Sequence, residues 1–319
     1  MPSFPPPKYP IEFYLEFQSN DRFVYRVSDL EELEKQHRQE VIRRLDQCHI
    51  YLLCKRPRVW IVSDSVVMDG SVVKFEVAFR QVGVERRFQT SLDQEFVGFP
   101  GTCLDVSPYP HRSIIARDSD GVQVGETLLA NFVHIMPGLP SEVRDLEVVY
   151  VGKGLRRSAQ DRLRHHETLQ RLLSDVSASE PDKEIFALVH SFEMRKPMMA
   201  LANAQAIITG DVAAVRYQKV LAYRPPLAHQ VALIEASCIS YFQTGAYNSH
   251  YIRFPEGSYQ FLNPVRDADF AALVVQLDNT NIGGQRVYSS TVPPAAIHYI
   301  VNDFRIPDGH LSFLTSVSE

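Results

Sequence analysis

The spacing of apolar residues predicts both helices and strands in the first part of the chain. A capping signal at Ser28 precedes apolar residues that recur at helical spacing, so a helix is expected to run to Asp46. Further on, two apolar runs flank Asp69-Gly70, a dipeptide that suits the positive φ angles of a tight hairpin turn. We therefore expect a mixed α/β N-terminal domain over residues 1–125, whose role the sequence leaves open.

The middle part, residues 126–250, begins with the pattern of a strand. The run Leu146-Glu147-Val148-Val149-Tyr150-Val151 is rich in β-branched residues, and Gly152-Lys153-Gly154 follows it. Two glycines around a lysine let the backbone approach a ligand closely, and the loop leads into a helix N-terminus, which favours anions. We expect phosphate to bind at this corner.

The helix after this loop is predicted to begin at Ser158, and it carries two candidate functional residues. Arg162 and His166 lie one turn apart, so their side chains point the same way, beside the end of the strand that carries Tyr150. Taken alone, such residues are also typical of a solvated helix surface.

A later helix, which follows Pro225-Pro226, places a carboxylate among apolar residues. Val231, Glu235, Cys238 and Phe242 fall on one helical stripe. A charge there is costly unless it is paired or bound to a metal. Glu235 is therefore either neutralised by a buried arginine or a ligand for a divalent metal ion.

The last part, residues 251–319, is predicted to be rich in strands. The apolar run 271–277 is typical of a strand, and Gly283-Gly284 with the residues after it suggests a hairpin or meander. This segment is expected to complete the core of the middle part, to pack on the N-terminal domain or to contact substrate.

Composition and charge narrow the function classes. The 319 residues are 45% hydrophobic and 22% charged, as in an ordinary globular protein, and the four scattered cysteines suggest buried thiols. The absence of a long apolar run or a leader pattern predicts a cytoplasmic protein with no membrane partner. A net charge of −5 argues against a protein that coats nucleic acid through its overall charge. Binding to nucleic acid therefore has to rely on a local group of basic residues, and residues 153–171 are the most basic stretch.

Together these residues resemble the GIY-YIG endonuclease superfamily. Val149-Tyr150-Val151-Gly152 looks like the second, YIG, strand; Arg162 and His166 match the family's Arg-x-x-x-His; Glu235 matches its metal-binding glutamate; and Tyr247-Asn248 matches its terminal asparagine. The resemblance covers roughly 120 of the 319 residues.

The chain departs from the family at the first, GIY, strand. A short way upstream of the YIG strand stands Asn131-Phe132-Val133-His134-Ile135, which has no tyrosine. Either His134 replaces the missing phenol or Tyr150 is the only tyrosine in the site.

The resemblance implies an α/β (α+β) fold with a small, mostly antiparallel sheet flanked by helices. It also implies a DNA endonuclease, acting most readily on double-stranded DNA with Mg²⁺ or Mn²⁺, and by analogy a role in restriction, repair or defence against foreign DNA. A homodimer or a protein partner could form through the N-terminal domain.

The resemblance also assigns roles to single residues. Glu235 would hold the metal, Arg162 would bind phosphate oxygens, Tyr150 or His166 would orient the attacking water, and Asn248 would fix local geometry. The residues expected to contact phosphates are Lys153, Arg156 and Arg157.

Two other functions remain open from the sequence. The missing first tyrosine favours a catalytically silent nucleic-acid-binding or protein-interaction module on the same fold. The glycine-lysine-glycine loop and the basic helix would also suit an enzyme acting on another phosphodiester or on a nucleotide.

Overall fold

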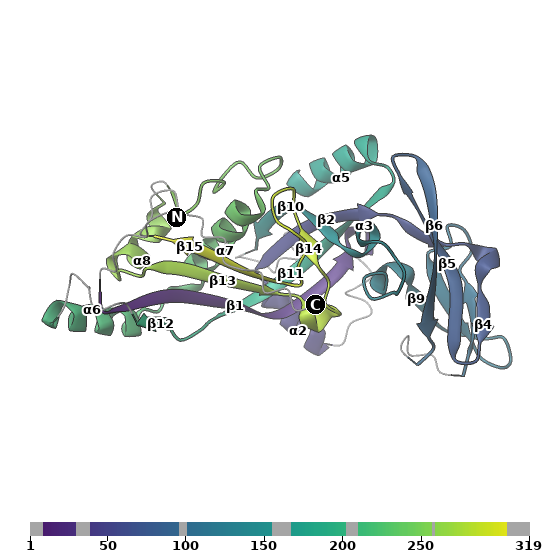
Figure 1. Cartoon of the computed structure of the whole chain (residues 1–319), viewed down its shortest axis with the longest axis horizontal. Coiled ribbons are helices and arrows are strands. Elements are labelled where there is room, and N and C mark those ends of the chain that lie inside the picture. Colours follow the sequence, from purple (N-terminus) through teal and green to yellow (C-terminus); the bar gives the residue numbers. More distant parts are fainter. Residues whose placement is uncertain are drawn as a thin grey trace.

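A computed structural model describes residues 9–29, 39–95, 101–154, 167–201, 210–256 and 259–304. Its main feature is an eight-stranded mixed sheet, sheet A, that curls into a half barrel (Figure 1). Across the sheet the strands are β14 (Val287–Tyr288), β10 (Leu146–Lys153), β2 (Ile50–Pro57), β11 (Lys183–Met194), β1 (Ile11–Arg26), β13 (Ala272–Asp278) and β15 (Ile297–Asp303), and β12 (Met198–Leu201) pairs with β1. The β1–β13 and β10–β14 pairs are parallel, and the other pairs are antiparallel.

Helices cover both faces of sheet A because each face is apolar. On one face, α2 (Gln39–Asp46) and α5 (Glu167–Ser179) pack through Leu45, Leu169, Leu172 and Val176. On the other, α7 (Leu227–Phe242) packs with α6 (Asp211–Ala222) and α8 (Asn263–Asp267). Three short 3-10 helices also belong to this part of the chain: η1 (Val27–Asp29), η4 (Gln260–Leu262) and η5 (Thr280–Ile282).

Residues 58–145, here called the insert, leave sheet A at the end of β2 and return at the start of β10. Where the chain leaves and returns, Lys55 pairs with Glu147. The insert has its own hydrophobic core, which runs from Val59 to Val143. Figure 1 shows it at one end of the molecule, beyond β2.

The insert consists of two small antiparallel sheets and short helices. Sheet B contains β3 (Val59–Ile61), β5 (Val72–Gln81), β4 (Val67–Asp69) and β6 (Val84–Asp93). Sheet C contains β7 (Cys103–Val106), β8 (Ser113–Arg117) and β9 (Gln123–Leu128). The short helices are η2 (Ser63–Ser65), η3 (Leu129–Asn131) and α3 (Ser141–Arg144).

The predicted mixture of helices and strands is confirmed, but sheet A is larger than the small sheet expected. The boundary proposed at residue 125 falls inside the core of the insert, and sheet A takes strands from all three predicted parts. The hairpin at Asp69-Gly70 is present, with Gly70 at φ 64°, and β13 to β15 complete sheet A. Within the described ranges, no helix is both long and apolar enough to cross a membrane.

Two local predictions are wrong. The segment 131–135 is not a strand, because the buried residues Leu129, Ala130, Val133 and Met136 recur at helical intervals around η3. Cys103 is exposed on the edge strand β7, whereas Cys48, Cys54 and Cys238 are buried as expected.

Candidate functional site

Two tyrosines from neighbouring strands pack together over a glycine. The rings of Tyr51 on β2 and Tyr150 on β10 have centroids 6.0 Å apart, and Gly152 pairs directly with Tyr51 across the two strands. A Cβ on Gly152 would lie 2.4 Å from the Cζ and Oη atoms of Tyr51 and 2.8 Å from Cε1 of Tyr150. The tyrosine pair therefore requires a glycine at this position.

An irregularity in β10 places Tyr150 on the same face as Tyr51. The pairing with β2 shifts register between Val148, which lies opposite Cys54, and Tyr150, which lies opposite Leu53. One extra residue in a strand resets the alternation of its side chains, and such bulges are common beside functional sites. As a result, Val148 faces α7, whereas Tyr150 faces α5.

An ion pair forms at the end of β10, on the side of α7. The Nζ atom of Lys153 lies 2.6 Å from Oε2 of Glu235, whose side chain is 11% exposed. Glu235 lies in a buried helix stripe with Val231, Cys238 and Phe242, as predicted, but its neutralising partner is a lysine. Burial, with a smaller contribution from the charge of Glu235, raises the pKa of Cys238 to about 12.

Asn248 ties the loop after α7 to β10. Helix α7 ends at Phe242. Gln243, the next residue, has the left-handed conformation, and the chain then passes the edge of β10. There Asn248 Oδ1 accepts hydrogen bonds from the Val151 amide (3.1 Å) and the Thr244 hydroxyl (2.7 Å), and Nδ2 donates to the Val151 carbonyl (2.9 Å). Asn248 thus fixes the backbone between Tyr150 and Gly152.

Four consecutive residues, Tyr150 to Lys153, therefore join the separate parts of the site. The tyrosine pair lies on the face covered by α5, the Lys153–Glu235 pair lies towards α7, and Asn248 binds the strand between them. Of the predicted site residues, the structure brings together Tyr150, Lys153, Glu235 and Asn248 around this strand end. The other four, Arg156, Arg157, Arg162 and His166, lie outside the described residues.

His134 does not lie at this strand end. It follows η3 and sits against Gly283, because a Cβ on Gly283 would lie 2.3 Å from its Nε2 atom. Burial, with a smaller contribution from the charge of Arg56, lowers the pKa of His134 to about 4. Arg56 is near the end of β2 remote from Tyr51, so a phenol, not His134, accompanies Tyr150.

Tyr51 is the site residue that the sequence analysis missed. It ends the triplet His49-Ile50-Tyr51, which shares its last two residues with the GIY motif and opens a buried run. The family pattern places its first strand a short way upstream of the second, whereas in this chain the insert separates β2 from β10. The triplet His49-Ile50-Tyr51 is the sequence feature that points to Tyr51.

At the strand end, Glu235 is the carboxylate expected to hold a divalent ion, and that expectation stays a prediction. One carboxylate, completed by water and phosphate oxygens, suits Mg²⁺, which usually keeps several waters. The contact with Lys153 means that the ammonium must share or release Glu235 when a metal binds. Among the described residues, no group of three or more His, Cys, Asp or Glu side chains could hold a metal ion.

Comparisons of the chain with protein-family models, with curated proteins and with solved structures found no match. The resemblance to the GIY-YIG superfamily therefore stays a prediction that rests on the residues described above.

Proposed function

We propose that the chain is a metal-dependent endonuclease that hydrolyses DNA phosphodiester bonds at the end of β10. The observation that carries the proposal is the packing of Tyr51 against Tyr150 over Gly152, at the strand end whose other face carries the Lys153–Glu235 pair. It supplies a tyrosine on each of the two strands where the GIY-YIG family has one. His49-Ile50-Tyr51 then takes the place of the first motif, with His49 where the family has glycine.

The chemistry divides among these side chains. Mg²⁺ or Mn²⁺ at Glu235 would polarise a phosphoryl oxygen and stabilise the leaving oxygen. Lys153 would bind a phosphate oxygen once its ammonium leaves the carboxylate. Tyr150 would orient the attacking water through its hydroxyl group, and the buried ring of Tyr51 would hold Tyr150 in place. Arg162 would bind two phosphate oxygens through its planar guanidinium, His166 would accept a proton, and Arg156 and Arg157 would contact flanking phosphates.

One observation favours the second candidate, a DNA-binding module without turnover. Tyr51 is fully buried and Glu235 is already paired with Lys153, so both groups are held in a resting arrangement. Such a module would keep the fold and the basic stretch and bind DNA without cutting it.

Cleavage of supercoiled plasmid separates the two candidates. The proteins are wild type, Tyr150→Phe, Arg162→Ala and Glu235→Gln, each with Mg²⁺, with Mn²⁺ and with chelator. Tyr25→Phe is the matched control, because Tyr25 is another buried tyrosine of the same core cluster, on β1. We expect metal-dependent nicking by wild type and the control and a loss of roughly 100-fold or more in the other variants. DNA binding without nicking by wild type would instead support the silent module.

A further inference from the structure

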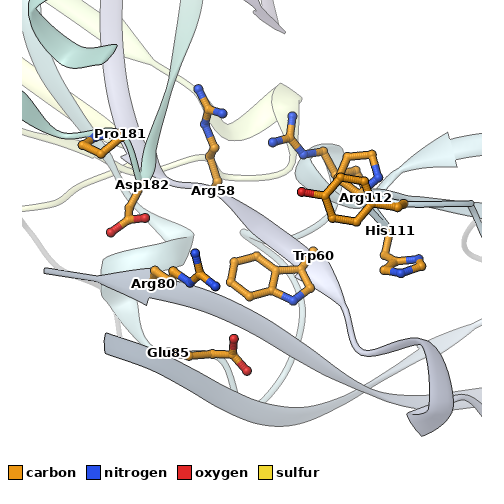
Figure 2. Close-up of a pocket in the computed structure, with 10 residues that line it drawn as sticks. Arg58, Trp60, Arg80, Glu85, His111, Arg112, Pro181 and Asp182 are labelled. Carbon is orange, nitrogen blue, oxygen red and sulfur yellow. The ribbon is translucent and has the colours of Figure 1, made fainter. Parts of the chain in front are cut away.

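A cavity of about 310 Å³ lies between the insert and the loop that precedes β11. Its walls carry three arginines and three aromatic side chains: Arg58, Arg80, Arg112, Trp60, Tyr109 and His111 (Figure 2). None of these residues belongs to the candidate nuclease site.

The positive charge of the cavity is not balanced by its own carboxylates. Glu85 pairs with Arg87 at 2.8 Å, outside the cavity lining, and Asp182 accepts a hydrogen bond from the Gly83 amide. Among the described residues, Arg80 and Arg112 have neither a salt bridge nor a side-chain hydrogen bond. Half-buried Glu184, which pairs with Arg26 at 3.9 Å, lies within electrostatic range of Arg58 and Arg112. Guanidinium groups without a bound carboxylate are ready to bind an anion in a bidentate manner.

The cavity is held in shape by backbone contacts. The Arg58 side chain donates from Nε to the Lys183 carbonyl at 2.9 Å, which fixes the stem, and its two terminal nitrogens make no hydrogen bond or ion pair among the described residues. The loop that carries His111 is anchored because the Ile61 amide donates to the His111 carbonyl at 2.8 Å. A site built in advance loses less conformational entropy when it binds.

The aromatic side chains offer flat surfaces beside these cations. Trp60 is half-buried in the centre of the group, with the Arg80 guanidinium 5.8 Å from its ring centroid. Tyr109 is 88% exposed and meets His111 edge to face. Figure 2 shows Arg58 and Arg112 extending upward beyond the indole and Arg80 beside it. A ligand that fits has a planar ring joined to an anionic group.

We propose that this cavity binds one nucleotide unit, with its base stacked on Trp60 and its phosphate held by Arg58 and Arg112. Unpaired bases are recognised in this way, through stacking on aromatic rings and guanidinium planes. The proposal rests on the proposed function, because it names the part of a DNA substrate that the insert would recognise. A free nucleotide offers the same chemistry, so the test must distinguish the two sources.

Trp60 is the only tryptophan of the chain, so its fluorescence reports on this cavity alone. The full-length Glu235→Gln protein is titrated in chelator with deoxyadenosine monophosphate, single-stranded DNA, duplex DNA with one unpaired nucleotide, fully paired duplex and inorganic phosphate. We expect quenching by the first three, and weaker or no quenching by paired duplex and phosphate. If the DNAs bind more tightly than the mononucleotide, the ligand of the cavity is a nucleotide within a DNA strand. If the mononucleotide binds more tightly, the ligand is a free nucleotide.

Substitutions identify the groups responsible. We expect Arg112→Ala to weaken binding at least tenfold, and because its side chain makes no hydrogen bond among the described residues, the fold should persist. The control is Arg117→Ala, which also removes one arginine charge, from sheet C, where Arg117 lies 3.7 Å from Asp105. This variant should bind nucleotides as tightly as the parent protein. Equal quenching by phosphate and nucleotides, or no quenching by any ligand, would overturn the proposal. Because no cleavage is needed, these results stand apart from the plasmid assay.

Discussion

Tyr51 and Tyr150 stand side by side, with ring centroids 6.0 Å apart, although the whole insert separates them in the sequence. Their contact is possible only because Gly152 has no side chain. A methyl group there must push against two rings in a packed core.

The first prediction concerns this glycine. Gly152→Ala should lower the free energy of unfolding by about 1–3 kcal/mol, as overpacking typically does, and reduce plasmid nicking by roughly 100-fold because the tyrosines move. The control is Gly245→Ala, whose added Cβ would lie 3.6 Å from the nearest atom, an ordinary contact. Denaturant unfolding and the nicking rate measure both effects. Unchanged nicking in Gly152→Ala would show that the tyrosine geometry does not matter for cleavage.

The Lys153→Met substitution tests whether Glu235 binds a metal ion. Lys153→Met leaves a nearly buried carboxylate without its ammonium partner, which should cost about 2 kcal/mol. Added Mg²⁺ should then raise the melting temperature of this variant more than that of wild type. Lys74→Met breaks an exposed ion pair of the same 2.6 Å length, with Asp69, and should change little. An identical response to Mg²⁺ in Lys153→Met and wild type would argue against a metal at Glu235.

Asn248 should act through its amide nitrogen. In Asn248→Asp an oxygen replaces the Nδ2 donor and faces the Val151 carbonyl, so two acceptors meet, and we expect a loss of about 1–3 kcal/mol. Asn20→Asp, at an exposed amide that donates to Glu193, serves as the matched change. Thermal unfolding of both variants provides the comparison, and equal losses would remove the special role of Asn248.

Acid should destabilise the protein through histidines that are buried without charge. Burial, with the nearby charge of Arg22, lowers the pKa of His190 to about 3, and within the described residues neither ring nitrogen has a hydrogen-bond partner. The neutral ring favours the folded state above the unfolded pKa of about 6.5, and this stability is lost as the pH falls from there towards 3.

Between pH 7 and pH 5, the free energy of unfolding of His190→Leu should therefore fall by about 2 kcal/mol less than that of wild type. Burial also lowers the pKa values of His134 and His298 to about 4, so part of the acid sensitivity should remain in this variant. Urea unfolding at several pH values gives the slopes, with the exposed His250→Leu as control. Parallel slopes for wild type and His190→Leu would refute the assignment.

The two proposed sites together predict where DNA is cut. Tyr51 lies near the start of β2 and Arg58 just beyond its end, so at about 3.3 Å per residue they are roughly 20 Å apart. At about 3.4 Å per base pair this span corresponds to about six base pairs. Sequencing the ends produced from a duplex with one unpaired nucleotide would reveal the offset. Cuts at positions unrelated to that nucleotide would show that the cavity does not determine where the DNA is cut.

The sequence predicted those parts of the site that depend on local pattern. The strand that carries Tyr150 is recognisable from its β-branched residues, and Glu235 stands out because it interrupts an apolar helix stripe. The partnership of Tyr51 with Tyr150 depends on strands far apart in the chain, and no periodicity reports which strands pair. The register shift before Tyr150 is equally invisible, because it arises from pairing with β2.

The insert leaves and rejoins sheet A at neighbouring positions of two paired strands, and its core is built from its own residues. Segments with adjacent ends can be lengthened, shortened or replaced without disturbing the strands that hold them. The arrangement makes residues 58–145 an exchangeable unit. Across evolution, or in the laboratory, a new insert could change what the protein recognises while β2 and β10 keep the same two tyrosines in contact.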